Sequence, residues 1–438
     1  MTRTSSQKSV KVEGILMKNS LKVAMVVIGD EILNGRTTDL NANWLAKFLF
    51  KEGMLLTSTQ FIRDNESEII ETLNRALNEA DIVITSGGIG PTLDDMTKKC
   101  LAKMFDKKII ENQTVIPVVE ENYRRFGRSW NPSLNFYHHF PEDFLAINNP
   151  KGLAPGLGFY LADRKKLLLS GPGVPREFHD MVSLEFFPMI QKYFRGQFVK
   201  NYQTIVRTHS VPEEKIFGEL EPELWNKLEK FGKVSSLPHT IGIDIIISYN
   251  GTEENHQLTQ NKIKDIFEQS KMQEYVWQYG NLSLSELILK KAVEKKLTFG
   301  FAESCTGGLT SSKFTDLSGS SACFMGSIVS YDNSIKEKIL GVQAETLKTF
   351  GAVSEQSVKE MCEGGKKVLN VDICVAITGI AGPTGGSAEK PVGTVYFGVH
   401  SKFGTQFETT VVPGDRPRKK DRFSDRALLL LLEEIEKH

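Results

Sequence analysis

Apolar runs and amphipathic stretches alternate along the first half of the chain. Residues 21–29 (LKVAMVVIG) form an uninterrupted apolar run, which is typical of a parallel strand buried on both faces. Residues 39–50 and 64–77 carry apolar side chains at helical spacing, and residues 81–85 (DIVIT) predict a further buried strand. Strands and helices that alternate with short glycine-rich loops predict a doubly wound α/β domain over residues 21–190.

The middle of the chain predicts a smaller unit. Residues 204–209 and 241–249 predict strands, and residues 257–271 predict a helix. We therefore expect a small α/β linker domain at residues 191–280. No side-chain pattern in this segment points to chemistry.

The last part of the chain predicts a third α/β domain, at residues 281–438. Ser283 and Glu286 form a capping box that begins its first helix. Residues 297–302 and 373–377 predict buried strands, and hydroxyl and glycine residues follow each of them closely. Because α/β folds place their sites at the carboxyl ends of strands, we expect the functional site of this domain there.

Ser304 is the candidate nucleophile of this domain. It lies in the stretch FGFAESCTGG (residues 299–308), where the predicted strand turns into a helix through Gly307 and Gly308. A hydroxyl at such a turn is held out of the sheet, and N–H groups at the start of the helix point toward an anion that forms beside it. The alternative is that Ser304 or Thr306 only caps the helix.

Three side chains are candidates for the general base that would activate Ser304. From residue 280 onward the only histidines are His400 and His438, so a serine–histidine arrangement would have to use His400. A lysine whose pKa is lowered by burial can act instead. Lys336 and Lys390 both lie in segments rich in glycine and hydroxyl residues, and Lys336 is favoured. The alternative for Lys336, a lysine on a solvated helix face, stays open.

Two further segments predict phosphate binding in the third domain. The loop TGIAGPTGG (residues 378–386) follows a predicted strand, and its glycines, Gly379 and Gly382 among them, let backbone N–H groups approach a phosphate closely. Arg416 lies in the basic turn PGDR before the last helix.

The first domain carries a separate candidate site in the loop GGIGPTLDD (residues 87–95). Its backbone and an upstream carboxylate predict nucleotide binding by Gly87, Gly88, Gly90, Thr92 and Asp30. Asp94 and Asp95 are the candidate ligands of a divalent cation such as Mg²⁺. The alternative is that the two carboxylates are favoured by the helix macrodipole alone.

Taken in order, these motifs resemble those of the CinA (competence/damage-inducible) family. AESCTGG, GSS, VSYDNSIK, GAVSE, ITGIAGP, KPVGTV and PGDR are similar to its C-terminal domain over about 150 residues. GDEILNG, GGIGPTLDD, LAPGLGF and GPGVPREF resemble its N-terminal domain, which is similar to the molybdopterin-binding MoaB/MogA fold. GDEIL stands where CinA proteins more usually have GTELL.

The resemblance implies a nicotinamide-nucleotide amidohydrolase. Such an enzyme converts nicotinamide mononucleotide (NMN) and water to nicotinate mononucleotide and ammonia by a serine/lysine mechanism, without a cofactor. It implies catalytic roles for Ser304, Lys336, Ser321, Tyr331 and Thr378, and substrate binding by Arg416. The turn and loop glycines Gly307, Gly308, Gly379 and Gly382 are expected to bind the substrate through their backbone. Both serines are expected in the site, and which of them attacks is left open. Lys420 stands where the family usually has a second arginine.

For the N-terminal domain, the resemblance implies a metal-dependent ADP-ribose pyrophosphatase. Two other functions stay open for the chain: a pterin- or nucleotide-binding module without turnover, and a competence-associated partner protein. We expect small-molecule nucleotides as ligands and a homodimer as the assembly.

Composition restricts these possibilities. Lys+Arg and Asp+Glu both number 54, so no net charge favours nucleic acid or an anionic membrane. The five cysteines show no disulfide or metal-ligand spacing and fit a reducing, cytoplasmic location. No apolar stretch is long enough to cross a bilayer, and the polar residues 1–20 predict a flexible tail and not a signal peptide.

Overall fold

The computed structural model describes residues 21–92 and 95–438. The predicted tail and Asp94 lie outside the described residues. The chain forms two compact units, and the boundary between them runs through the segment predicted as a linker. The first unit holds the residues up to 203 together with 228–233 and 247–262, and the second holds the remainder.

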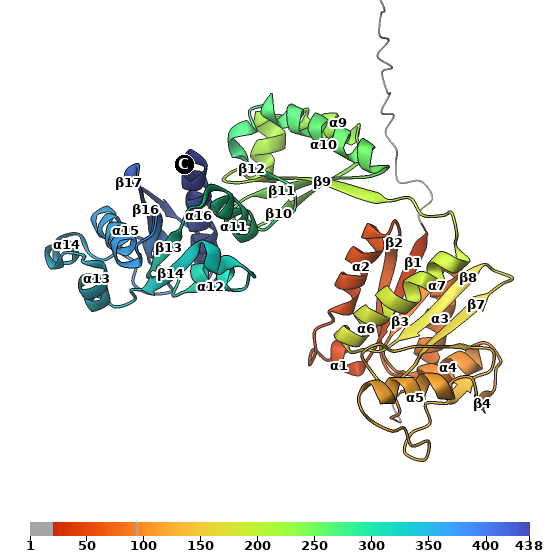
Figure 1. Ribbon diagram of the computed structural model, residues 1–438. Coiled ribbons are helices and arrows are strands. Elements are labelled where there is room, and N and C mark those ends of the chain that lie inside the picture. The colour runs from red at the N-terminus through yellow and green to blue at the C-terminus, as the bar shows by residue number, and fades with distance from the viewer. Residues whose placement is uncertain (1–20, 93–94) are drawn as a thin grey trace, which may run out of the picture. The chain divides into compact units, whose positions relative to one another are not determined.

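The first unit is built on a six-stranded sheet with the strand order β2-β1-β3-β8-β7-β6 (Figure 1). The strands are β1 (Lys22–Ile28), β2 (Leu55–Ile62), β3 (Ile82–Ser86), β6 (Leu145–Ile147), β7 (Gly156–Leu161) and β8 (Lys166–Gly171). Strands β1, β2, β3 and β8 are parallel to one another, and β7 pairs in antiparallel register with both of its neighbours, β8 and β6. The helical elements are α1 (Asp30–Leu33), α2 (Asn41–Lys51), α3 (Glu66–Glu79), α4 (Thr97–Met104), α5 (Ile116–Arg125), α6 (Pro175–Met181), the π-helical turn η1 (Val182–Phe186) and α7 (Phe187–Tyr193).

Strand β1 shows why its sequence is apolar throughout. Val23, Met25 and Val27 belong to a core shared with α2, α6 and α7. The alternate residues of the same strand belong to a second core shared with α3, α4 and α5. Because successive side chains of a strand point to opposite faces, a sheet covered on both faces needs a continuous apolar run. The predicted doubly wound α/β domain is therefore confirmed.

A separate two-stranded ribbon lies in the segment that follows α4. It pairs β4 (Ile109–Glu111) with β5 (His139–Pro141) in antiparallel register, with Glu111 opposite His139. All three residues of β4 are exposed.

The linker segment forms a four-stranded sheet with the order β10-β11-β9-β12. Its elements are β9 (Asn201–Thr208), α8 (Glu213–Lys215), η2 (Ile216–Leu220), α9 (Leu224–Glu229), β10 (Lys233–Pro238), β11 (Ile243–Asn250), α10 (Glu253–Glu268), η3 (Gln273–Tyr275) and β12 (Val276–Tyr279). A separate linker domain at residues 191–280 stays a prediction, because the boundary between the compact units divides this segment.

The last part of the chain is built on a five-stranded sheet with the order β14-β13-β15-β16-β17 (Figure 1). The strands are β13 (Phe299–Glu303), β14 (Phe324–Val329), β15 (Ile373–Gly379), β16 (Thr394–Ser401) and β17 (Gly404–Val411). The helices are α11 (Leu284–Lys295), α12 (Leu309–Thr315), the 3₁₀ turn η4 (Ser320–Ala322), α13 (Asn333–Leu340), α14 (Ala344–Phe350), α15 (Glu355–Leu369) and α16 (Arg416–Lys437). Ser283 and Glu286 form the predicted capping box of α11.

Both faces of this sheet are also covered. Phe299 and Phe301 of β13 pack in a core with α11, α12 and α16. Ala302 packs in another core with α13 and α15. Strands β14, β13 and β15 are parallel, so their carboxyl ends meet at one edge of the sheet.

No described helix combines the length and apolarity that a membrane span requires.

Candidate active site

Ser304 follows the last residue of β13. Its N–H donates to the Ile377 carbonyl of the neighbouring strand at 2.9 Å, which fixes the serine at the carboxyl edge of the sheet. The chain then reverses through Gly307 and Gly308, whose φ angles of 63° and 91° lie in the left-handed region that side chains disfavour. Helix α12 begins directly after this turn.

Glu303 holds the turn in place, a role that the sequence did not predict. Its side chain is fully buried, and its carboxylate accepts from the N–H groups of Gly308 at 2.9 Å, Thr310 at 3.2 Å and Ser311 at 3.0 Å. In the first turn of α12, the Thr310 and Ser311 N–H groups are thus satisfied by Glu303, and the Leu309 N–H donates to the Thr306 backbone carbonyl. The side chains of Ser304 and Thr306 make no cap hydrogen bond, so the alternative that either hydroxyl caps the helix does not hold. The available signal was a carboxylate at the end of an otherwise apolar strand.

Two backbone donors remain at the turn. The N–H groups of Cys305 and Thr306 donate to no carbonyl among the residues that the structure describes, and the Cys305 N–H faces its own thiol. They immediately follow the serine, where the oxyanion of an acyl-transfer intermediate would form. Burial raises the pKa of the Cys305 thiol to about 12, so this cysteine is not an activated nucleophile.

The Lys336 amine lies within hydrogen-bond distance of the Ser304 hydroxyl. It lies on α13, which the Asp332 side chain caps by accepting from the Ser334 N–H. The Lys336 Nζ atom is 3.2 Å from Ser304 Oγ, 2.6 Å from the Ser330 carbonyl and 3.2 Å from the Tyr331 carbonyl. An ammonium group has three protons for these three acceptors. A neutral amine would give two protons to the carbonyls, and its lone pair would face the serine hydroxyl.

The surroundings of Lys336 favour that neutral amine. The side chain is 1% exposed, which excludes the alternative of a solvated surface lysine. Burial lowers the pKa of Lys336, although the Asp332 carboxylate acts in the opposite direction. Neutral lysine is the form that can accept a proton.

The other two candidate bases lie elsewhere. Lys390 Nζ donates to the carbonyls of Phe350 at 2.9 Å and Val353 at 2.7 Å, and so fixes the segment before α15. His400 Nδ1 is 2.8 Å from Thr405 Oγ1. His400 is opposite Cys374, at the beginning of β15, whereas Ser304 lies at the other edge of the sheet.

A cavity of about 190 Å³ surrounds the serine and the lysine. Thr378 lies in its wall and donates to the Ala352 carbonyl at 2.8 Å, which links the end of β15 to the segment before α15. The lining residues are Ser304, Cys305, Tyr331, Asn333, Lys336, Ala352, Val353, Thr378, Gly379, Ala381 and Arg416. The sequence prediction had not assigned Asn333, Ala352, Val353 or Ala381 to the site.

Positive charge collects at one side of this cavity. Arg416 Nη1 donates to the Gly382 carbonyl at 2.6 Å, and its Nη2 donates to Tyr331 Oη at 3.2 Å. Arg416 is also the first residue of α16, where the helix dipole favours an anion. Lys420 Nζ is 3.9 Å from the position that a Cβ atom would take at Gly307, so this lysine lies beside the serine turn.

Ser321 is not among the residues that line this cavity. Ser321 precedes β14, whose first residue, Phe324, pairs with Phe299 at the beginning of β13. Ser304 follows the other end of β13. Because the strands are parallel, the two serines lie at opposite edges of the sheet, separated by about 16 Å of strand. Any role of Ser321 stays a prediction.

The loop after β3 in the first unit has a pair of positive-φ glycines, as the turn after β13 has. Gly87 and Gly88 have φ angles of 107° and 68°, and Gly87 N–H donates to the Gly171 carbonyl at 3.0 Å. Asp30 begins α1 directly after β1 and its N–H donates to Asp64 Oδ2. The predicted nucleotide-binding residues Gly87, Gly88, Gly90, Thr92 and Asp30 therefore follow two neighbouring parallel strands, β1 and β3.

The predicted metal ligand Asp95 is engaged within its own loop. Its carboxylate accepts from the N–H groups of Gly90 and Thr92, each at 2.9 Å, and from the Thr92 hydroxyl. Across the described ranges, no cluster of three acidic, histidine or cysteine side chains forms around Asp95. Asp94 lies outside the described residues, so a metal ion held by Asp94 and Asp95 stays a prediction.

Two family models match the chain. The model described as "CinA C-terminal domain" matches residues 281–435, which include the serine–lysine cavity. The model described as "Probable molybdopterin binding domain" matches residues 24–192, which identifies the first domain as MoaB/MogA-like.

Relatives match along almost the whole chain. A CinA-like protein of Chlorobaculum tepidum is 34% identical over 426 residues, covering 95% of this chain and 100% of the relative. A CinA-like protein of Kosmotoga olearia is 32% identical over 421 residues, covering 94% and 100%. The solved structure of the competence damage-inducible protein A from Klebsiella pneumoniae shares 30% identity, covers 35% of this chain and 95% of that chain, and has a TM-score of 0.34. The chain therefore belongs to the CinA family, with a MoaB/MogA-like N-terminal domain and a CinA C-terminal domain.

Proposed function

We propose that the C-terminal domain hydrolyses the carboxamide of nicotinamide mononucleotide, with Ser304 as the nucleophile and Lys336 as the base. One observation carries the proposal: the buried Lys336 Nζ lies 3.2 Å from Ser304 Oγ, while two backbone carbonyls orient the same amine. This is the relation between nucleophile and oriented base that covalent hydrolysis requires. A site that only binds a ligand does not need a lysine amine buried against a serine hydroxyl.

In the first step, neutral Lys336 accepts the proton of the Ser304 hydroxyl as Oγ attacks the carboxamide carbon. The carbonyl oxygen becomes an oxyanion, for which the N–H groups of Cys305 and Thr306 are available donors. Lys336 then returns the proton to the amide nitrogen, the C–N bond breaks, and ammonia leaves. The product of this step is an ester between Ser304 and the nicotinoyl group.

In the second step, Lys336 accepts a proton from water as that water attacks the ester carbon. The C–Oγ bond breaks and the proton passes to Ser304 Oγ. Nicotinate mononucleotide leaves, and both side chains return to their starting state.

The charged side of the cavity supports a nucleotide as the substrate. Arg416 offers a guanidinium at the start of α16, and Lys420 adds a second cation near the serine turn. A phosphate monoester is the anion that a guanidinium and a helix N-terminus bind together. The pyridinium ring of NMN also withdraws electrons from the carboxamide, which makes its carbon easier to attack.

Ammonia release from NMN by the full chain tests the proposal. Ser304→Ala should lower kcat/KM by about 10³-fold or more, because nucleophile and base act as a unit. Ser321→Ala is the matched serine control and should keep near-wild-type turnover. Absence of ammonia release by the wild-type chain would support the alternative of a binding or partner protein. Loss of turnover in Ser321→Ala alone would transfer the nucleophile to that residue.

The loop at Gly87–Thr92 supports a second candidate function, binding or cleavage of a nucleotide diphosphate such as ADP-ribose in the first domain. The supporting observation is the pair of left-handed glycines after β3, beside the Asp30 turn after β1. The test is hydrolysis of ADP-ribose with Mg²⁺ and with a chelator present. Cleavage that the chelator stops, with deamidation unchanged, would agree with two independent activities. Binding without cleavage under any divalent metal would make this domain a binding module.

A further inference from the structure

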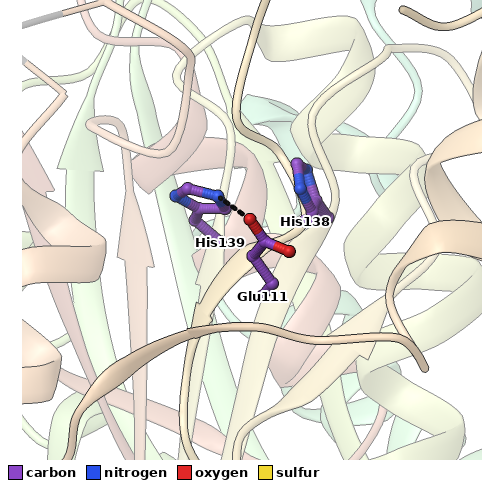
Figure 2. A group of neighbouring side chains, drawn as sticks. All are labelled: Glu111, His138 and His139. Carbon is purple, nitrogen blue, oxygen red and sulfur yellow. Dashed lines mark ion pairs between the residues drawn. The ribbon is translucent and has the colours of Figure 1, made fainter. Parts of the chain in front are cut away.

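A group of three potential metal ligands lies on the two-stranded ribbon of the first unit, and none of its members was assigned to a site above. Glu111 is on β4, His139 is directly opposite on β5, and His138 precedes His139. Figure 2 shows the three side chains gathered at one point of the ribbon. One ligand atom from each residue lies within 4.8 Å of those of the other two, and His139 Nε2 is 3.7 Å from Glu111 Oε1.

An ion pair between His139 and Glu111 would account for two members of the group, but not for the position of His138. Its side chain is 7% exposed, and its Nδ1 atom has no hydrogen-bond partner among the described residues. The ring is held edge-on against Trp130 and against His139, with centroid distances of 5.0 and 4.6 Å. A buried ring nitrogen without a partner is unfavourable, so a ligand that completes it would be bound favourably.

We propose that Glu111, His138 and His139 bind a transition-metal ion of the zinc class. Two imidazole nitrogens and one carboxylate oxygen form a ligand set that suits Zn²⁺ and its first-row neighbours and does not suit Mg²⁺, which prefers oxygen ligands throughout. Three protein ligands leave a position for water in a tetrahedral ion. The site is distinct from the metal predicted at Asp94 and Asp95.

Small side-chain movements would bring the three ligand atoms to the distances that a tetrahedral zinc ion requires. Bonds of about 2.0–2.2 Å place the ligand atoms of a tetrahedral zinc ion about 3.3–3.6 Å apart. Because no separation between the three ligand atoms exceeds 4.8 Å, each must shorten by at most about 1.5 Å. The side chains of Glu111 and His139 are 69% and 37% exposed and can move toward the buried His138.

Metal binding at this group would cross-link the ribbon. Two-stranded ribbons are marginally stable alone, and β4 and β5 have three residues each. An ion held by Glu111 and His139 would join the strands across their register. The expected consequence is slower amide exchange in residues 107–143 when the metal is present.

Titration of the untagged full chain with Zn²⁺ and with Co²⁺ tests the proposal. The wild type should bind one equivalent at micromolar protein concentration, and Co²⁺ should give the visible absorption of a tetrahedral ion. Glu111→Gln and His139→Asn should each weaken binding at least tenfold and remove the metal-dependent slowing of amide exchange at 107–143. His256→Asn, which changes a histidine of the same unit that pairs with Tyr249, should bind as the wild type does.

His138→Asn is expected to lose binding as well, but its buried position makes a folding defect possible. The exposed positions Glu111 and His139 therefore decide the result. Absence of a stoichiometric site in the wild type would overturn the proposal. Binding that persists unchanged in the Glu111→Gln/His139→Asn double variant would place the metal elsewhere and overturn it equally.

Discussion

Two turns of this chain use the same backbone design. One follows β3 at Gly87 and Gly88, the other follows β13 at Gly307 and Gly308, and all four glycines have positive φ. In both turns a carboxylate accepts from nearby N–H groups: Asp95 in the first and Glu303 in the second.

The turns differ in what surrounds them. The turn after β13 holds a serine hydroxyl against a buried lysine amine, whereas the Thr92 hydroxyl in the loop after β3 bonds to Asp95. A glycine turn followed by a helix provides backbone N–H groups that can bind an anion. Covalent hydrolysis needs, in addition, a nucleophile and an oriented base. The second turn has both among the residues that the structure describes.

Removal of the Lys336 amine, which distinguishes the turn after β13 from the turn after β3, should lower turnover the most. Lys336→Met keeps an apolar chain of similar length but leaves Ser304 without a proton acceptor. We expect kcat for NMN to fall by about 10³-fold or more, with little change in KM. Lys338→Met, an exposed lysine of the same helix, is the matched control. Turnover that survives in Lys336→Met would return Lys390 and His400 to consideration.

Removal of Arg416 should have the next largest effect. A charge-assisted hydrogen bond to phosphate contributes about 1.5–3 kcal/mol, so Arg416→Ala should lower kcat/KM for NMN by about 10- to 150-fold, mainly through KM. Nicotinamide riboside, which lacks the phosphate, should be affected much less. Arg418→Ala, an exposed arginine of the same helix turn, is the control. Equal losses on both substrates would show that Arg416 maintains structure and does not bind the phosphate.

The pH dependence of turnover should report the state of Lys336. Only the neutral amine can accept the Ser304 proton, and burial lowers the pKa of Lys336 below the ordinary 10.5. In the acidic limb kcat/KM should therefore rise up to about tenfold per pH unit and level off below pH 10.5. A limb that levels off at or above 10.5 would contradict a lysine activated by burial.

Replacing the turn carboxylates Glu303 and Asp95 by amides should give the smallest effects on turnover. Glu303→Gln keeps the shape of the side chain but weakens its bonds to α12, so we expect a loss of about 1–3 kcal/mol in the free energy of unfolding and a fall of about tenfold in kcat for NMN. Asp95→Asn weakens the other turn and should leave deamidation unchanged. Urea unfolding and ammonia release measure both effects. A fall in deamidation after Asp95→Asn would contradict the independence of the two sites.

Local sequence patterns predicted the elements and the central pair well. The apolar run at residues 21–29 became β1, covered on both faces, and the capping box at Ser283 formed as expected. Ser304 was a candidate because of its place at a strand-to-helix turn, and Lys336 was favoured over Lys390 and His400 because of its glycine- and hydroxyl-rich surroundings. Their approach to 3.2 Å follows from the adjacent ends of the parallel strands β13 and β14.

What the sequence did not predict depends on contacts between distant residues or on sheet edges. Ser321 precedes its strand and so lies at the edge opposite Ser304, which sequence order alone does not reveal. The hydrogen bonds from the Gly90 and Thr92 N–H groups to the Asp95 carboxylate also depend on how the loop folds, which the sequence does not reveal. Glu111 and the two histidines are 27 residues or more apart, and only the register of the ribbon brings them together.

The most direct test of the central claim is to capture the covalent intermediate. NMN is mixed with the full chain, the reaction is quenched with acid within the first turnovers, and the peptides are analysed by mass spectrometry. The serine mechanism predicts that the peptide with Ser304 gains the mass of NMN less ammonia, and that Ser304→Ala abolishes this adduct. Turnover without an adduct on Ser304, or an adduct on the peptide with Ser321, would contradict the account.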